Sequence, residues 1–187
     1  MGFHTFPIER ADALEDPSRY RYCSREELVA MLATTEDDVV ADLGSGTGFY
    51  TDDVAPFVET IYAVDVQSAM HDRYREKGAP ENVEFVTTEV SSLPFANDHL
   101  DAAYSNMTHH EYASDEAFEE LARVLRPGGR LVTVDWSATG TEESGPPLDE
   151  RFGPDDVVDQ LETAGFEIET AMDRPETFAI VAVRKEE

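Results

Sequence analysis

The 187-residue sequence is poor in lysine and in cysteine. Of its 14 basic residues only Lys77 and Lys185 are lysines, and Cys23 is the one cysteine. A single cysteine excludes an internal disulfide and a cysteine metal cage. No uncharged run approaches the roughly 18 residues of a membrane span, and the first residues lack the basic and apolar regions of a signal peptide. We therefore expect a cytoplasmic protein that does not enter a membrane.

Acidic residues, in contrast, are abundant. The chain has 41 of them and a formal net charge of −27. Such a field repels nucleic acids and anionic membranes, whose binding requires basic side chains. The acidic residues are spread along the whole chain rather than gathered in a tail, which is typical of the solvation strategy of halophilic proteins. The charge therefore says little about the substrate.

Apolar runs alternate with helical patterns along the chain, which predicts βαβ units, a parallel sheet and an α/β fold. The length fits a single domain over residues 1–187, with an N-terminal arm and cap helix over 1–35 and a core over 36–187. A short turn between the last two strands predicts an antiparallel hairpin. The expected strands are Val39–Leu43, Thr60–Val64, Val83–Thr87, Ala102–Ser105, Arg130–Asp135, Phe166–Met172 and Thr177–Val183.

Helix signals fall between these strands. Ser24 is expected to cap one helix and Ser114 another, while Pro154 opens a third. Pro127–Gly129 predicts the turn that leads into the fifth strand. Residues 1–23 and 137–153 do not fit the alternation, and long irregular stretches of this kind are often lids over a functional site.

The most specific motif is VVADLGSGTGFYT, residues 39–51. An apolar strand that contains Asp42, two residues before the first glycine, is followed by Gly44-Ser45-Gly46-Thr47-Gly48 and then by a helix. Glycines here allow a tight turn and let a ligand lie against the main chain. A dinucleotide fingerprint would need a third glycine where Phe49 stands. An ordinary strand-to-helix turn is the structural alternative.

The Gly-x-Gly-x-Gly spacing with Asp42 before it resembles the first motif of class I S-adenosylmethionine-dependent methyltransferases. ELARVLRPGGRLVTVDW resembles a later helix, turn and strand of the same family, so the resemblance covers nearly the whole chain. RYRYCSREEL, HHE and GPPLDERFGPDDV are similar to its small ubiquinone/menaquinone-methyltransferase-like group. The resemblance implies a Rossmann-like, seven-stranded mixed sheet in the order 3-2-1-4-5-7-6 with strand 7 antiparallel, and S-adenosylmethionine as cofactor.

Two further segments, together with Asp42 of the glycine motif, contribute to the expected cofactor site. Asp65, followed by Val66, ends the second strand 19 residues after Gly46, where a carboxylate can accept both ribose hydroxyls. Glu89 and Val90 resemble the segment that meets adenine, although Glu89 replaces the usual aspartate and an ordinary loop acid is the alternative. Asp42 would suit the ligand's ammonium or order the loop.

The fourth strand leads to the expected reaction centre. Ser105 and Asn106 lie at its carboxyl end, which is where ligands bind in open α/β sheets. His109, His110 and Glu111 follow directly, and we interpret them as the acceptor pocket or as a general base. A purely polar role at a helix start is the alternative. A metal site is disfavoured because adjacent histidines point in different directions.

Aromatic and loop residues are expected to close the site. The face of Tyr22, and that of Tyr20, suits a sulfonium by cation–π attraction, although both can equally be packing residues of a docked arm. Position alone makes four more residues candidates for the acceptor pocket: Trp136, Pro146, Pro147 and Arg151.

Together these motifs predict methyl transfer from S-adenosylmethionine to an oxygen, nitrogen or carbon atom of a small molecule. Two alternatives stay open: an NAD-type nucleotide-binding oxidoreductase, and an S-adenosylmethionine-binding protein without turnover. Neither a nucleic-acid partner nor a membrane partner is expected. The oligomeric state is left open, with a homodimer among the options.

If the acidic surface is an adaptation to salt, folding will depend on salt. Repulsion among the surplus acids is long-ranged at low ionic strength, whereas at 1 M salt the Debye length is only about 3 Å. We expect the melting temperature to rise markedly between about 0.1 and about 3 M KCl. A flat profile, measured by circular dichroism, would contradict this interpretation.

Overall fold

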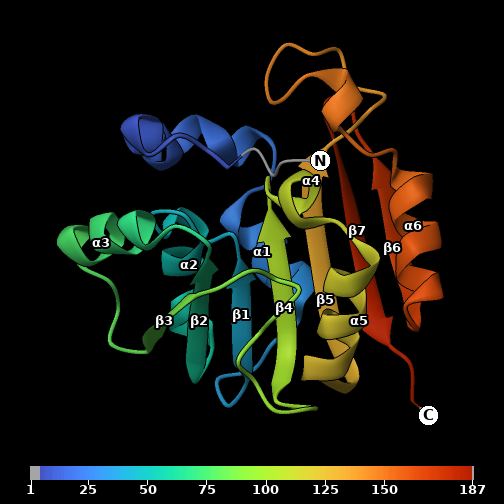
Figure 1. Cartoon of the computed structure of the whole chain (residues 1–187), viewed down its shortest axis with the longest axis horizontal. Coiled ribbons are helices and arrows are strands. Elements are labelled where there is room, and N and C mark those ends of the chain that lie inside the picture. Colours follow the sequence, from blue (N-terminus) through green and yellow to red (C-terminus); the bar gives the residue numbers. More distant parts are fainter. Residues whose placement is uncertain (1–4, 187) are drawn as a thin grey trace.

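One seven-stranded sheet organises the computed structural model, which describes residues 5–186 (Figure 1). Its order is β3-β2-β1-β4-β5-β7-β6, with β1 to β5 parallel and β7 antiparallel to both neighbours. The predicted order and orientation are thus confirmed; residues 1–4 of the expected arm and residue 187 lie outside the described part. The strands are β1 (Val39–Leu43), β2 (Thr60–Asp65), β3 (Val83–Thr87), β4 (Leu100–Asn106), β5 (Leu125–Trp136), β6 (Phe166–Asp173) and β7 (Thr177–Arg184).

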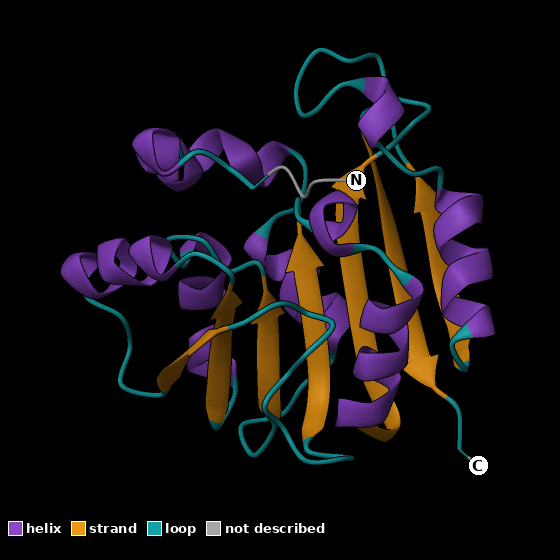
Figure 2. Ribbon diagram, viewed as in Figure 1, coloured by secondary structure: helices purple, strands orange, loops and turns teal. Residues whose placement is uncertain are grey.

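Helices cover both faces of the sheet (Figure 2). Leu28 and Val54 belong to an apolar cluster under β1, β4 and β5 on one face, and Phe118 and Leu161 belong to a second cluster on the other. None of the helices described between residues 5 and 186 is long and apolar enough to cross a bilayer. The α-helices are α1 (Arg25–Leu32), α2 (Phe49–Val54), α3 (Ser68–Lys77), α4 (His109–Tyr112), α5 (Asp115–Val124) and α6 (Pro154–Thr163).

The predicted helix signals are confirmed. The Ser24 hydroxyl accepts a 3.2 Å hydrogen bond from the Glu27 amide at the start of α1, and Ser114 caps α5 in the same way. Pro154 is the first residue of α6. These caps satisfy amide groups that an isolated helix end leaves unpaired.

The predicted turn at Pro127–Gly129 lies inside β5 instead of before it. Leu125 already pairs with Leu100 of β4, and regular pairing resumes at Arg130 opposite Ala102. The intervening residues form an excursion in which Gly128 adopts a φ of 76°, a conformation that glycine favours. The strand therefore begins earlier than its apolar pattern indicated.

The last strand of the sheet order, β6, is an exposed edge with an irregularity. Its pairing with β7 shifts register between Ile168 and Thr170, so that Glu169 bulges out. Glu169 forms a 2.5 Å ion pair with Arg130 of β5. Bulges of this kind are common on sheet edges and increase the local twist of the strand.

The two segments that did not fit the alternation both lie beyond the carboxyl ends of the parallel strands (Figure 1). The arm contains two short 3₁₀ helices, η1 (Ile8–Glu15) and η2 (Pro17–Arg21). The loop between β5 and α6 contains a third, η4 (Leu148–Glu150), whereas η3 (Ala55–Phe57) extends α2. The arm and the loop therefore approach the same end of the sheet.

His109, one of the expected acceptor-pocket residues, is instead part of the core. Its imidazole is fully buried, and neither ring nitrogen has a hydrogen-bond partner among residues 5–186. Burial lowers the pKa of His109 to about 4. The ring is neutral in the folded protein at neutral pH. Four aromatic rings surround it, with centroids 5.4 to 6.0 Å away: Tyr112, Phe118, Phe152 and Phe178.

We predict that His109→Leu stabilises the protein at neutral pH by about 1 kcal/mol, because it removes an unpaired buried polar ring. The unfolded chain binds a proton at His109 below about pH 6.5, whereas the folded chain does not until about pH 4. Protonation of His109 in the unfolded chain should therefore lower the free energy of unfolding of the wild type by up to about 3 kcal/mol between about pH 6.5 and about pH 4. The stability advantage of the variant should grow as pH falls.

Urea unfolding at several pH values measures this difference. His99→Gln, which removes an exposed imidazole at the opposite end of the sheet, is the matched control. A less stable His109→Leu variant would show that the imidazole makes a contact the apolar environment does not explain.

Candidate functional site

The glycine loop between β1 and α2 has the close approach that its sequence predicts. Gly44, Gly46 and Gly48 have φ values of 78°, 54° and 82°. A Cβ atom at Gly44 would lie 2.2 Å from Cγ2 of Thr108, and one at Gly48 would lie 2.1 Å from the Tyr74 ring. Side chains at these positions would force their neighbours away, so the loop requires glycine.

Asp65 fixes this loop to the end of β2. One carboxylate oxygen accepts a 2.9 Å hydrogen bond from the Gly46 amide, and the other accepts a 2.8 Å bond from the Gln67 amide. Burial raises the pKa of Asp65, while these amide bonds oppose the rise. Each oxygen keeps a second lone pair with which it can accept a ligand hydroxyl.

Asp42 does not line the site. Its carboxylate is buried below the loop and accepts a 2.6 Å hydrogen bond from the Thr51 hydroxyl in α2. Burial raises the pKa of Asp42 to about 6. Of the two roles expected for it, ordering the loop is the one its position fits. Gly48, the last glycine of the loop, does not line the cavity either and lies against the Tyr74 ring.

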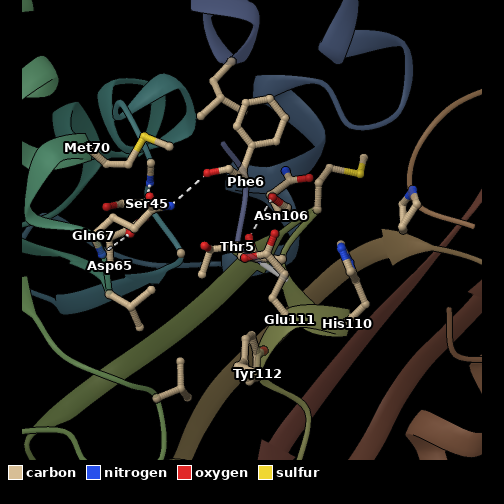
Figure 3. A pocket seen from close by; sticks show the side chains of 18 of the residues that line it. Thr5, Phe6, Ser45, Asp65, Gln67, Met70, Asn106, His110, Glu111 and Tyr112 are labelled. Atoms are coloured by element: carbon tan, nitrogen blue, oxygen red, sulfur yellow. Dashed lines mark hydrogen bonds between the residues drawn. The ribbon is translucent and has the colours of Figure 1, made fainter. Parts of the chain in front are cut away.

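A cavity of about 800 Å³ opens beside the glycine loop and Asp65 (Figure 3). Of the residues expected at the cofactor site, Ser45, Val66, Glu89 and Val90 line the cavity, whereas Ser105 is fully buried in β4 behind it. The size is in the range of a small-molecule or cofactor site.

The arm forms the roof of this cavity. The backbone oxygen of Phe6 accepts a 3.0 Å hydrogen bond from the Gln67 side chain, which is drawn in Figure 3. Arg10 and Arg19 also line the cavity, and Arg19 donates to the Leu14 carbonyl at 2.7 Å. A prediction based on strands and their carboxyl ends missed these arm residues.

Two polar side chains of the wall lack partners. Both amide atoms of Asn106 and the hydroxyl of Ser45 are buried without a hydrogen bond among the described residues. Buried polar groups are normally paired, and those of a binding site are often completed by the ligand. These atoms therefore indicate where polar groups of a ligand lie.

His110 lies at the other end of the cavity from Asp65 (Figure 3). A buried carboxylate, that of Asp135, holds its ring. Its Nδ1 atom lies 2.8 Å from Oδ2 of Asp135, the same oxygen that accepts a 2.6 Å bond from the His110 amide. Burial favours the neutral ring, but the charge and hydrogen bond of Asp135 outweigh it and raise the pKa of His110. With Nδ1 donating to Asp135, Nε2 is free to take a proton.

Glu111 also lines the cavity, next to His110 on α4. His109, Glu111 and His110 do not converge, because His109 points into the core. No group of three histidine, cysteine, aspartate or glutamate side chains between residues 5 and 186 is arranged to hold a metal ion.

The aromatic residues expected at the site divide into two groups. Tyr22 and Trp136 both line the cavity and contact each other edge to face, with ring centroids 4.7 Å apart. Tyr20 lies outside it, where its hydroxyl donates a 2.8 Å hydrogen bond to Asp53. Tyr20 is thus a packing residue of the docked arm, the alternative that its position had left open.

The loop residues divide in the same way. Pro146 and Pro147 line the cavity. Arg151 does not: its side chain turns back and donates to the carbonyls of Ser144 and Pro146 at 2.6 and 2.8 Å. Arg151 therefore holds the conformation of the loop, and the neighbouring Pro146 and Pro147 form the cavity wall.

Asp135 is the main functional candidate that the sequence reasoning missed. It lies in a buried strand position that looked like an ordinary strand end. The available signal was an acidic residue next to Trp136 at the end of an apolar strand. Only the pairing of β4 with β5 brings Asp135 close to His110, which follows β4.

Comparisons with known proteins agree with this geometry. A family model described as a methyltransferase domain matches residues 41–133. The ubiquinone/menaquinone biosynthesis C-methyltransferase of Ectopseudomonas mendocina is 35% identical over 114 residues, which cover 54% of this chain and 43% of that protein. The chain thus spans less than half the length of the curated relatives it matches.

Solved structures extend the similarity to nearly the whole chain. An S-adenosylmethionine-dependent methyltransferase from Aquifex aeolicus matches with a TM-score of 0.87 and 28% identity, over 96% of this chain and 99% of that one. A geranyl diphosphate C-methyltransferase from Streptomyces coelicolor shares the fold, with a TM-score of 0.74 at 17% identity over 98% and 90% of the two chains.

The sheet order, the glycine loop and these similarities lead to one family and decide against the dinucleotide alternative. Residues 41–133 match a methyltransferase domain, and the chain as a whole has the fold of the class I S-adenosylmethionine-dependent methyltransferases, which implies S-adenosylmethionine as its cofactor.

Proposed function

We propose that this chain transfers the methyl group of S-adenosylmethionine to a small molecule, and that His110 takes up the proton which the acceptor loses. The observation that carries the proposal is the His110–Asp135 pair, which is held at 2.8 Å in the wall of the same cavity as Asp65 and Asn106. S-adenosylmethionine supplies an activated methyl group on a positively charged sulfur.

The residues of the cavity fit this cofactor. The glycine loop leaves room for a ligand against the backbone, and Asp65 has acceptor capacity for ribose hydroxyls. Glu89 and Val90 line the wall where adenine would lie next to Val66. The roles of these residues are proposals, supported by position.

The methionine end would then lie near Ser45 and Asn106. Their unpaired buried polar atoms suit the amino and carboxylate groups of the cofactor. Arg19 of the arm adds a positive charge to the same cavity, which suits the carboxylate.

The acceptor would lie at the His110 end, between Trp136, Tyr22 and the prolines of the loop. These side chains exclude water and orient the acceptor for in-line attack, which is the main requirement when the leaving group is already good. His110 matters when the acceptor atom carries an acidic hydrogen, as in phenols, enols and protonated amines. The relative named above is a C-methyltransferase, but the atom methylated here is not decided by that name.

The electrostatics support a small molecule over a nucleic acid. The net charge of −27 repels phosphate chains, and the roofed cavity is of small-molecule size. Location in the cytoplasm stays a prediction.

Loss of the Asp65 carboxylate tests the cofactor site. Asp65→Ala should weaken S-adenosylmethionine binding by about 1.5 to 3 kcal/mol in calorimetry, because the ribose hydroxyls lose a charged acceptor. Asp72→Ala, an exposed acid on α3, is the control and should bind normally. Unchanged binding in Asp65→Ala, or tight competition by NAD, would overturn the assignment.

Loss of the imidazole tests the proposed base. His110→Gln should lower kcat/KM for methyl transfer by about 100-fold while S-adenosylmethionine affinity changes by less than about 0.5 kcal/mol. Since a base must be deprotonated, the wild-type rate should fall as pH drops through the raised pKa of His110. Phenols, quinols and amines form the acceptor panel, with His99→Gln as control. If no acceptor turns over, a binding protein without turnover becomes the better description.

A further inference from the structure

Glu111 has a position in the cavity that the proposed function leaves unused. It is the third residue of α4, and its side chain lies between Asp65 on one side and His110 on the other (Figure 3). The cofactor must cross this interval if its ribose is at Asp65 and its methyl group points to His110. Glu111 therefore faces the region where the reacting sulfur lies.

The environment of Glu111 makes its charge sensitive to what binds. Burial raises the pKa of Glu111 to about 7, while His110 lowers it and the charges of Asp65 and Asp135 raise it further. Both protonation states are thus within reach at neutral pH. The other charged groups that line this cavity are Arg10 and Arg19 on the arm, Glu89 after β3 and Glu150 on η4.

Methyl transfer removes the positive charge from the sulfur. The bond between sulfur and the methyl carbon breaks, its electron pair stays on sulfur, and the acceptor atom forms the new bond. The sulfonium thereby becomes the neutral thioether of S-adenosylhomocysteine, and the proton of the acceptor goes to Nε2 of His110. The positive charge stays on the imidazolium until His110 releases this proton to solvent. A carboxylate near the sulfur attracts the first species and has no comparable partner in the second.

We propose that Glu111 distinguishes the charged cofactor from its neutral product, being ionised beside the sulfonium and taking up a proton once the sulfur is neutral and His110 has released the proton of the acceptor. The proposal rests on the proposed function for the placement of the sulfur. This role differs from the acceptor-pocket role expected from the sequence, because Glu111 would interact with the charge of the cofactor and not with the acceptor.

The sign of the effect follows from linkage. A cation near Glu111 lowers its pKa, so S-adenosylmethionine binding releases protons and becomes tighter as pH rises towards 7, then levels off. S-adenosylhomocysteine lacks the cation and binds without this dependence. Preference for substrate over product is therefore expected to increase with pH, which favours product exchange at neutral pH.

Calorimetric titration of both ligands into the full chain tests this directly. Between about pH 5.5 and about pH 8, the ratio of the two dissociation constants should change in favour of S-adenosylmethionine by about tenfold, given one unit charge at a few ångströms. Glu111→Gln should abolish most of this change. Glu150→Gln, which alters another acid of the same wall, is the matched control and should retain it.

His110 is a second titratable group beside Glu111, and the charge of Asp135 raises its pKa, so its contribution must be separated. His110→Gln should keep the pH-dependent ratio if Glu111 is the source. A ratio that persists in Glu111→Gln and disappears in His110→Gln would overturn the proposal, and so would a flat ratio in the wild type.

A second measurement needs no variant. Titrations in buffers of different ionisation enthalpy count the protons released on binding, and near pH 6.5 S-adenosylmethionine should release a substantial fraction of one proton while S-adenosylhomocysteine releases almost none. Equal release would contradict the role of Glu111. Failure of S-adenosylmethionine to bind would instead contradict the proposed function, so the two outcomes are distinct.

Discussion

The carboxylate of Asp65 holds together the parts from which the site is built. It accepts hydrogen bonds from the backbone amides of Gly46 and Gln67. The Gln67 side chain in turn donates a hydrogen bond to the backbone oxygen of Phe6. Hydrogen bonds to a charged group contribute about 1.5 to 3 kcal/mol each. The glycine loop, the end of β2 and the roof are thereby fixed relative to one another before any ligand arrives.

The N-terminal arm is attached to the core by basic side chains, of which the sequence has few. Lys77 pairs with Glu15 at 3.2 Å and Arg174 with Glu27 at 2.6 Å, so scarce cations link the first 35 residues to the core. Ion pairs that are partly exposed are weak and are screened by salt. Arg151 differs, because it holds the loop after β5 through neutral carbonyl groups.

The fold could be predicted almost completely because its signals are local. Strand periodicity, helix caps and the glycine loop each act over a few residues, and the family resemblance supplied the sheet order. The exception within the strands was β5, where Leu125 pairs with β4 ahead of the Pro127–Gly129 excursion. Turn residues do not reveal that a strand continues through them.

The site could be predicted only in part, since its walls come from distant segments. Spacing placed Asp65 and His110 in the cavity, but it could not tell His109 from its neighbour, and the two differ by the direction in which α4 presents them. Asp135 and the arm residues depend on tertiary contacts that no local pattern encodes. The binding roles of the site residues stay predictions.

The bulge at Glu169 has a consequence for how copies of this protein behave in concentrated salt. An exposed edge strand invites pairing with the edge of another molecule, and acidic side chains usually prevent this by repulsion. In roughly 1 M salt that repulsion reaches no further than about 3 Å. The displaced backbone at Glu169 still breaks the regular ladder that a second strand would need. The shape of the β6 backbone therefore protects this edge from pairing with another molecule, and dissolved ions do not weaken this protection.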